Sequence, residues 1–355
     1  MKKLFKTIVI LSLTIIIGFA STEAFAGNKD RTGQAGANEL LINPWAASSG
    51  WANAGMASVK GVDAMWGNVA GISFVNTMDI NFSYTNWLAG SGTKVVSFGA
   101  LVRVSESLVL GLDFMSMNFG EIERTTNENP DAGIGTFKPS LMNINLAVAK
   151  SFSNSIHGGI LVKIISESIA DMKCSGVAFD AGIQYVTGLT DNIHFGITLK
   201  NIGPTMKYSG DGLVLKMDPY WMNNTSMTIV NRTDEFELPT QLCIAAAYDF
   251  NFQNSSRLSL AFNFNSNAFS KDQFIFGLEG SFRDILVLRG GYTFENGIFK
   301  NIEDMECTNV HKGLSLGASV QAPLNKKGLK ICIDYAYRNT AHWNGTHSIG
   351  ARILF

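Results

Sequence analysis

The feature that most constrains this chain is a strict alternation of apolar and polar residues, which recurs in segments of eight to ten residues. In MDINFSYT (78–85), Met, Ile, Phe and Tyr alternate with Asp, Asn, Ser and Thr. The same period of two appears in LSLAFNFN (258–265), in LKICIDYAYR (329–338) and in the last residues up to Phe355. A period of two places successive side chains on opposite faces of a β-strand. The chain is therefore predicted to consist of strands with one apolar face.

This alternation predicts fourteen strands, each close to the length of about nine to eleven residues that a tilted strand needs to cross a bilayer. An even number of strands is what a closed antiparallel bacterial barrel requires. The predicted strands lie near 78–88, 94–104, 107–117, 140–151, 155–166, 175–187, 192–200, 239–251, 256–266, 272–283, 285–295, 312–322, 328–338 and 345–355.

The lengths of the connections separate a membrane barrel from a soluble sandwich. The long segments 118–139, 201–238 and 296–311 all follow odd-numbered strands, whereas even-numbered strands are followed by short segments such as 152–154. Outer-membrane barrels have short periplasmic turns and longer external loops, and a sandwich has no reason to sort its loops in this way. Alternation alone fits both folds. With the loop lengths and strand number, it predicts an all-β transmembrane antiparallel barrel over residues 78–355.

The start of the chain predicts export. Lys2 and Lys3 precede an apolar stretch at 8–20 and an Ala-Phe-Ala site at 24–26, so residues 1–26 are interpreted as a signal peptide. The formal net charge of −1 provides no excess of positive charge that would favour binding to nucleic acid. We therefore expect a protein of the cell outer membrane, in contact with its lipid and not with nucleic acid.

Residues 27–77 differ in amino-acid composition from the strands that follow. The stretch 47–72 is rich in Gly, Ala, Ser and Asn, and Trp45, Trp51 and Trp66 are spaced along this part of the chain. A barrel of about fourteen strands encloses more space than its inward side chains fill, and small residues permit tight turns and close backbone approach. We predict a compact hatch inside the barrel; the alternative is a flexible periplasmic tail.

Residues 31–72 resemble the N-terminal signature of the PorV/PorQ family, which is itself similar to FadL-type outer-membrane transport barrels. The resemblance begins at Gly33 and continues through NELLI (38–42). It departs where Gly67 and Val69 stand at positions that the family fills with Trp and Pro. The hatch motif carried over onto this sequence consists of Trp66, Asn68, Ala70 and Gly71.

The resemblance implies a non-enzymatic role in type IX protein secretion. The partners that it implies are the translocon pore, the C-terminal domains of secreted cargo, and the surface attachment or sortase machinery. A FadL-like channel that takes up hydrophobic small molecules is the alternative, and an apolar tunnel past Trp51 and Trp66 would favour it. An enzyme acting on lipid at the barrel rim is a third hypothesis, which needs a close acid–base pair.

The sequence predicts no catalytic, cofactor-binding or metal-binding residues, because it contains no HExxH, GxSxG, Walker or zinc pattern. Inward Asp, Lys and Arg residues favour a salt-bridged lumen wall over a solute path. The external loops 201–238 and 296–311 are the candidate partner surface; for the stretch 206–239, the alternative is a loop folded over its own barrel mouth. Cys174 and Cys307 are hypothesised to form a disulfide between external loops. The partner-surface residues are Tyr208, Met217, Tyr220, Trp221 and Met222.

Overall fold

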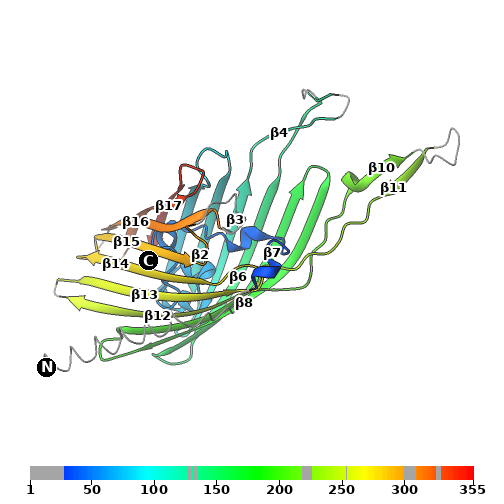
Figure 1. Cartoon of the computed structure of the whole chain (residues 1–355). Helices are drawn as coiled ribbons and strands as arrows, with labels where there is room; N and C mark the ends of the chain where they lie inside the picture. Colours follow the sequence, from blue (N-terminus) through cyan, green and yellow to red (C-terminus); the bar gives the residue numbers. More distant parts are fainter. Residues whose placement is uncertain are drawn as a thin grey trace.

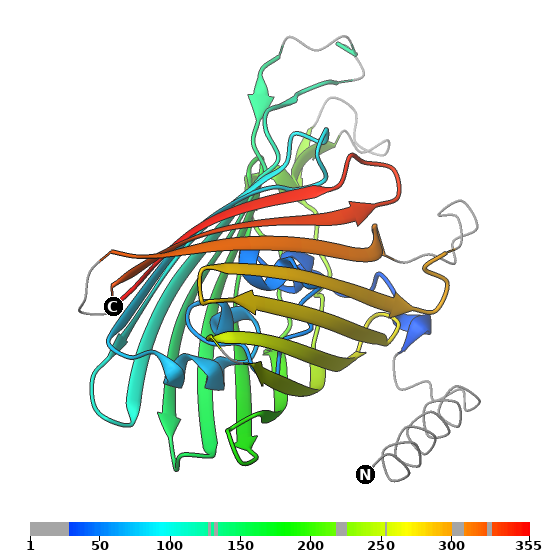
Figure 2. The ribbon, with the colours of Figure 1, turned by 90° about the vertical axis from the view of Figure 1, so that its left-hand side faces the viewer.

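The computed structural model describes residues 28–126, 129–130, 134–217, 226–252, 254–299, 309–324 and 329–355. Among these residues, fourteen strands close into one antiparallel barrel, in which β1 pairs with β2 on one side and with the last strand on the other (Figures 1 and 2). The barrel strands are β1 (Met78–Asn86), β2 (Lys94–Arg103), β3 (Leu108–Asn118), β6 (Ser140–Ser151), β7 (Ile156–Ile169), β8 (Met172–Thr187), β9 (Ile193–Ile202), β12 (Gln241–Phe252), β13 (Ser256–Asn267), β14 (Gln273–Phe282), β15 (Leu286–Glu295), β16 (His311–Pro323), β17 (Lys330–Thr340) and β18 (Thr346–Leu354).

The predicted fold class and all fourteen predicted strands are confirmed. Two short hairpins were not predicted, because their strands of two to four residues are too short to show a period. One hairpin joins β4 (Ile122–Glu123) to β5 (Thr136–Phe137). The other joins β10 (Val214–Met217) to β11 (Met227–Val230), after the short helix η4 (Asp211–Leu213).

The barrel wall is polar inside and apolar outside. On β1, the inward side chains of Asp79 and Asn81 are at most 1% exposed, whereas the outward Phe82 is 47% exposed. Outward Leu, Ile, Val and Phe side chains are exposed on strand after strand around the barrel. Soluble monomers rarely expose contiguous apolar surface beyond a few hundred Å², and a lipid-facing barrel alternates apolar-out and polar-in. The soluble sandwich is therefore excluded.

The two ends of the barrel differ. The long connections, including the β4–β5 and β10–β11 hairpins, project from one end, which we term the loop end; the other end has short turns and is termed the turn end (Figures 1 and 2). Thr77 N donates to Phe355 O over 3.3 Å, which places both residues at the turn end. Asn28 N donates to Asn267 O over 3.4 Å at the loop end. Residues 28–77, termed the N-terminal segment, therefore run through the lumen from the loop end to the turn end.

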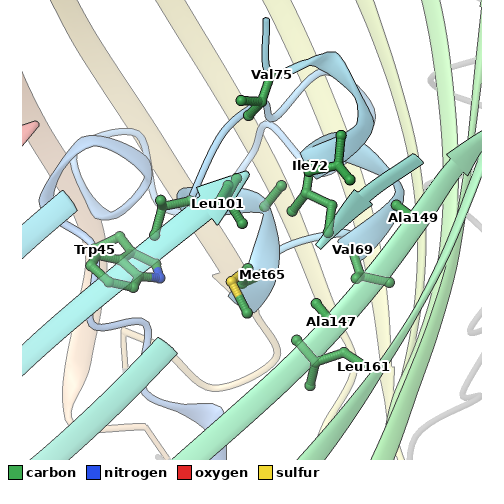
Figure 3. Packing of buried hydrophobic residues seen from close by; sticks show 12 residues of the cluster. Trp45, Met65, Val69, Ile72, Val75, Leu101, Ala147, Ala149 and Leu161 are labelled. Atoms are coloured by element: carbon green, nitrogen blue, oxygen red, sulfur yellow. The ribbon is translucent and has the colours of Figure 1, made fainter. Parts of the chain in front are cut away.

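The N-terminal segment folds into short helices that pack on the inner wall. They are η1 (Lys29–Arg31), η2 (Asn38–Leu41), α2 (Ala46–Ser49), α3 (Asp63–Trp66) and η3 (Val69–Phe74). Trp45, Met65 and Ile72 of the segment lie in one buried apolar cluster with Leu101 of β2 and Leu161 of β7 (Figure 3). Among the described residues, no helix has both the length and the apolar character needed to cross a membrane.

Candidate functional site

The wall carries inward-facing glycines where the backbone of the N-terminal segment passes. A Cβ atom added to Gly291 on β15 would lie 2.2 Å from the carbonyl oxygen of Trp51. A Cβ added to Gly317 on β16 would lie 2.7 Å from the Cα of Gly50. Only glycine permits backbone to approach backbone this closely. The wall glycines whose added Cβ would lie within 3 Å of the segment's backbone are Gly159, Gly196, Gly291 and Gly317, whereas a Cβ on Gly99, Gly182 or Gly277 would first meet side chains of the segment.

A buried carboxyl group fixes the middle of the segment. Asp63, at the start of α3, accepts hydrogen bonds from Ser48 N over 3.1 Å and Ser48 Oγ over 3.0 Å, and from Asn81 Nδ2 on β1 over 2.9 Å. Next to it, Asp79 Oδ2 on β1 accepts from Val62 N over 3.0 Å. Burial raises the pKa of Asp63, and Arg352 opposes that rise. These bonds tie both helices α2 and α3 to the wall.

The hatch motif forms the start of η3. Asn68 Oδ1 accepts from Ala70 N over 3.2 Å and so caps the helix, while Asn68 Nδ2 donates to Ile183 O of β8 over 3.0 Å. One side chain therefore both caps the helix and joins it to the wall. Val69 is the first residue of η3, a position at which proline is well tolerated but not required. A Cβ on Gly71 would lie 2.1 Å from the carbonyl oxygen of Val59.

Trp66 connects two parts of the segment and the wall. Its Nε1 donates to Leu40 O over 3.3 Å. The ammonium of Lys200 on β9 lies 3.4 Å from the centroid of a Trp66 ring, and this lysine is fully buried. A desolvated ammonium over an indole face is attracted by the ring quadrupole. The Lys200 contact therefore holds Trp66 against β9.

A cavity of about 540 Å³ lies at the turn end, between the N-terminal segment and β9, β12, β13, β14 and β15. Its wall is a network of paired charges. Arg257 Nη2 and Arg289 Nε lie 2.6 and 2.7 Å from the two carboxylate oxygens of Glu279. His194 Nε2 lies 3.2 Å from Asp249 Oδ2. The contacts give the salt-bridged wall that the sequence favours.

The cavities that border Trp51 and Trp66 do not form the apolar tunnel that would favour a hydrophobic channel. Trp51 borders the charged cavity, and the space beside Trp66 is a cavity of only about 10 Å³. The N-terminal segment therefore fills the lumen around Trp66.

The predicted partner residues fall in different surroundings. Met217 lies on β10 and is 54% exposed. Tyr208 is half-buried: its ring packs on Phe236 with centroids 5.9 Å apart, and its hydroxyl donates to Glu167 on β7. The predicted residues Tyr220, Trp221 and Met222 lie outside the described residues.

Cys174 does not lie in an external loop, as the sequence suggested. It is 2% exposed on β8, because β7 and β8 continue their pairing to Ile169 and Met172. Cys307 lies outside the described residues, so the disulfide stays a prediction. Cys174, Cys243 and Cys332 are free thiols among the described residues.

No protein-family model matches the chain, and no curated protein matches it in sequence. In fold it is similar to FadL-type outer-membrane barrels. A FadL homologue from Pseudomonas aeruginosa superposes with a TM-score of 0.51 at 11% identity, covering 87% of this chain and 96% of that one. The Pseudomonas putida toluene transporter TodX superposes with a TM-score of 0.53 at 11% identity, covering 88% and 97%. At this identity the likeness shows the fold.

Proposed function

We propose that this protein is an outer-membrane channel in which the N-terminal segment is a hatch that closes the lumen and moves to admit small molecules. The observation that carries the proposal is the course of the segment, which enters at the loop end, leaves at the turn end and contacts wall glycines on several strands. The apolar outer face supports placement in a bilayer, with the loop end outside and the turn end in the periplasm.

Small hydrophobic molecules are the substrate class that the fold comparison favours, since TodX is a toluene transporter. Because the lumen is closed beside Trp66, passage requires the hatch to leave the wall. The charged cavity then forms the periplasmic exit, whose paired charges hold water and release an apolar solute readily.

Uptake by intact cells tests the channel. We expect cells that express the protein to take up radiolabelled toluene faster than cells that lack the gene, and locking the hatch to the wall by chemical cross-linking to abolish the difference. Equal rates in the two strains, for a barrel shown to be folded in the membrane, would exclude this function.

A second candidate function is a part in type IX secretion, as the PorV/PorQ resemblance of residues 31–72 implies. The β10–β11 hairpin favours it, because a ribbon exposed on both faces suits a protein partner. On this proposal the hairpin binds cargo C-terminal domains or the translocon pore, before cargo passes to the surface attachment machinery. The exposed apolar residues of the hairpin are Val214, Leu215, Met217, Met227, Ile229 and Val230.

Deleting the gene separates the two candidates. The secretion role predicts that cargo carrying the secretion domain no longer reaches the cell surface, and that the wild-type gene restores it. The channel role predicts normal cargo and impaired growth on a hydrophobic carbon source.

A further inference from the structure

The loop end of the N-terminal segment is joined to the connection between β9 and β12, which carries the β10–β11 hairpin. Gly36 N donates to Glu237 O over 3.1 Å, and Arg31 Nη2 lies 2.6 Å from Glu237 Oε1. Leu40 of η2 packs in one buried cluster with Met206 and Leu238 of the same connection. Segment, wall and connection therefore meet at one junction.

Two buried carboxyl groups face this junction. Glu39 on η2 and Glu167 on β7 are each 4% exposed. The hydroxyl of Tyr208, from the connection, donates to Glu167 Oε2. The Oε1 atoms of both glutamates are buried without a hydrogen-bond partner among the described residues. The apolar cluster at this junction includes the thiol of Cys174 on β8, and Tyr208 packs against it.

No ion pair within the described chain joins a lysine or arginine to Glu39 or Glu167. The cations of the adjacent wall have other partners: Lys163 pairs with Asp180 over 2.7 Å, and Lys200 lies over Trp66. Two ionised carboxylates that are buried at one junction without a paired cation are strongly unfavourable.

One proton resolves this arrangement. Protonation of Glu39 removes one of the two negative charges and gives its carboxyl group a hydroxyl that can donate a hydrogen bond within the junction. Burial, and after it the negative charge of Glu167, raises the pKa of Glu39 to about 7.

We propose that protonated Glu39 is a latch that holds the loop end of the N-terminal segment against β7 and the β9–β12 connection, and that loss of this proton releases it. The inference rests on the proposal that the segment is a hatch, and it names the signal that regulates its opening. Because Tyr208 of the β9–β12 connection donates to Glu167, a partner that moves this connection acts on the same junction.

The direction in which pH changes the stability of the latch follows from the difference between the pKa of Glu39 in the latched and the released state. The latched state binds a proton up to about pH 7, whereas a released and hydrated Glu39 returns to the ordinary glutamate pKa of 4.5. The latch is therefore fully stable below that lower value. It weakens by up to roughly tenfold per pH unit as pH rises between the two values, and levels off above the higher one.

Backbone hydrogen–deuterium exchange of residues 36–44, in detergent and corrected for intrinsic rates, tests the latch without any transport assay. In the wild type, we expect protection to fall at least about tenfold between roughly pH 5.5 and pH 8.5. In Glu39→Gln the side chain is neutral at every pH, so protection should lose its pH dependence. The matched control Glu237→Gln, in the same junction, should keep it.

Protection that is independent of pH in the wild type, or the same pH dependence in Glu39→Gln, would overturn the latch. Should Glu39→Gln fail to fold, Glu167→Gln replaces it: removal of the neighbouring charge must move the wild-type midpoint to lower pH. A latch that behaves as expected in a barrel without toluene flux would leave this inference standing and remove the channel proposal.

Discussion

Gly290 and Gly291 are neighbours on β15 that face opposite sides of the wall, so alanine at each position isolates the contact between the wall and the N-terminal segment. A Cβ at Gly291 would lie 2.2 Å from Trp51 O and 2.3 Å from Trp51 C, both backbone atoms. At Gly290 the nearest atom is Leu316 Cδ2 at 3.8 Å, an ordinary contact. The two substitutions change strand propensity equally, and only Gly291→Ala should push on the segment.

The displacement needed is roughly 1 Å, because carbon and carbonyl oxygen must separate to van der Waals distance. Overpacking of this kind costs about 1–3 kcal/mol. Since about 1.4 kcal/mol is a factor of ten, the population with the segment detached from the wall should rise roughly five- to 150-fold in Gly291→Ala. Single-channel recording in planar bilayers measures that population as the frequency of conducting events, and the tryptophan emission, to which Trp45, Trp51 and Trp66 of the segment contribute, reports exposure of the segment.

Gly290→Ala should match the wild type in event frequency, emission and thermal stability. The reasoning is refuted if Gly291→Ala also matches the wild type in all three, because the segment would then not depend on this contact. A fall in stability without any rise in conducting events would show that the contact is structural and that the segment does not gate the lumen.

Three further predictions concern other contacts. Asn68→Ala removes both a helix cap and the bond to Ile183 O, so it should destabilise the segment by about 1–2 kcal/mol, measured by denaturant melts of the folded barrel. Leu215→Ser with Ile229→Ser changes exposed positions of the hairpin; it should leave the melting temperature unchanged and, if the secretion role is right, reduce surface cargo severalfold. Purified mature protein should need detergent to stay in solution and should migrate differently with and without boiling; solubility without detergent would contradict a lipid-facing wall.

The strands could be predicted because each one is specified locally. On β13, Leu258, Leu260 and Phe262 alternate with smaller or polar residues, and a period of two has one structural meaning over eight residues. The lengths of the connections then favoured a closed membrane barrel over a soluble sandwich. The β10–β11 hairpin gives no such signal, since Val214 and Leu215 are both exposed although they face opposite sides of a four-residue strand.

Cys174 shows where local prediction of an element's end fails. The sequence predicted a loop around it, but β7 and β8 pair to Ile169 and Met172 across a turn at Ala170, which takes a positive φ of 49°. A non-glycine residue gives little warning of such a turn. The strand therefore extends past the predicted boundary and carries Cys174 into the barrel.

The candidate site is harder to predict than the wall, because its contacts join residues that are distant in sequence. The alternation of the strands predicts that Gly291 and Glu167 face the lumen. Their neighbours Trp51 and Glu39 can be known only from the path of the N-terminal segment. That path is set by the wall: glycine leaves room where the segment's backbone passes, and polar side chains such as Asp79 offer it hydrogen bonds. Glycine weakens the interior of a strand and often marks a place where another backbone approaches closely. A series of inward glycines around one barrel therefore indicates a backbone lying against the wall. The amino-acid sequence alone therefore carries a signal that locates the segment inside the lumen.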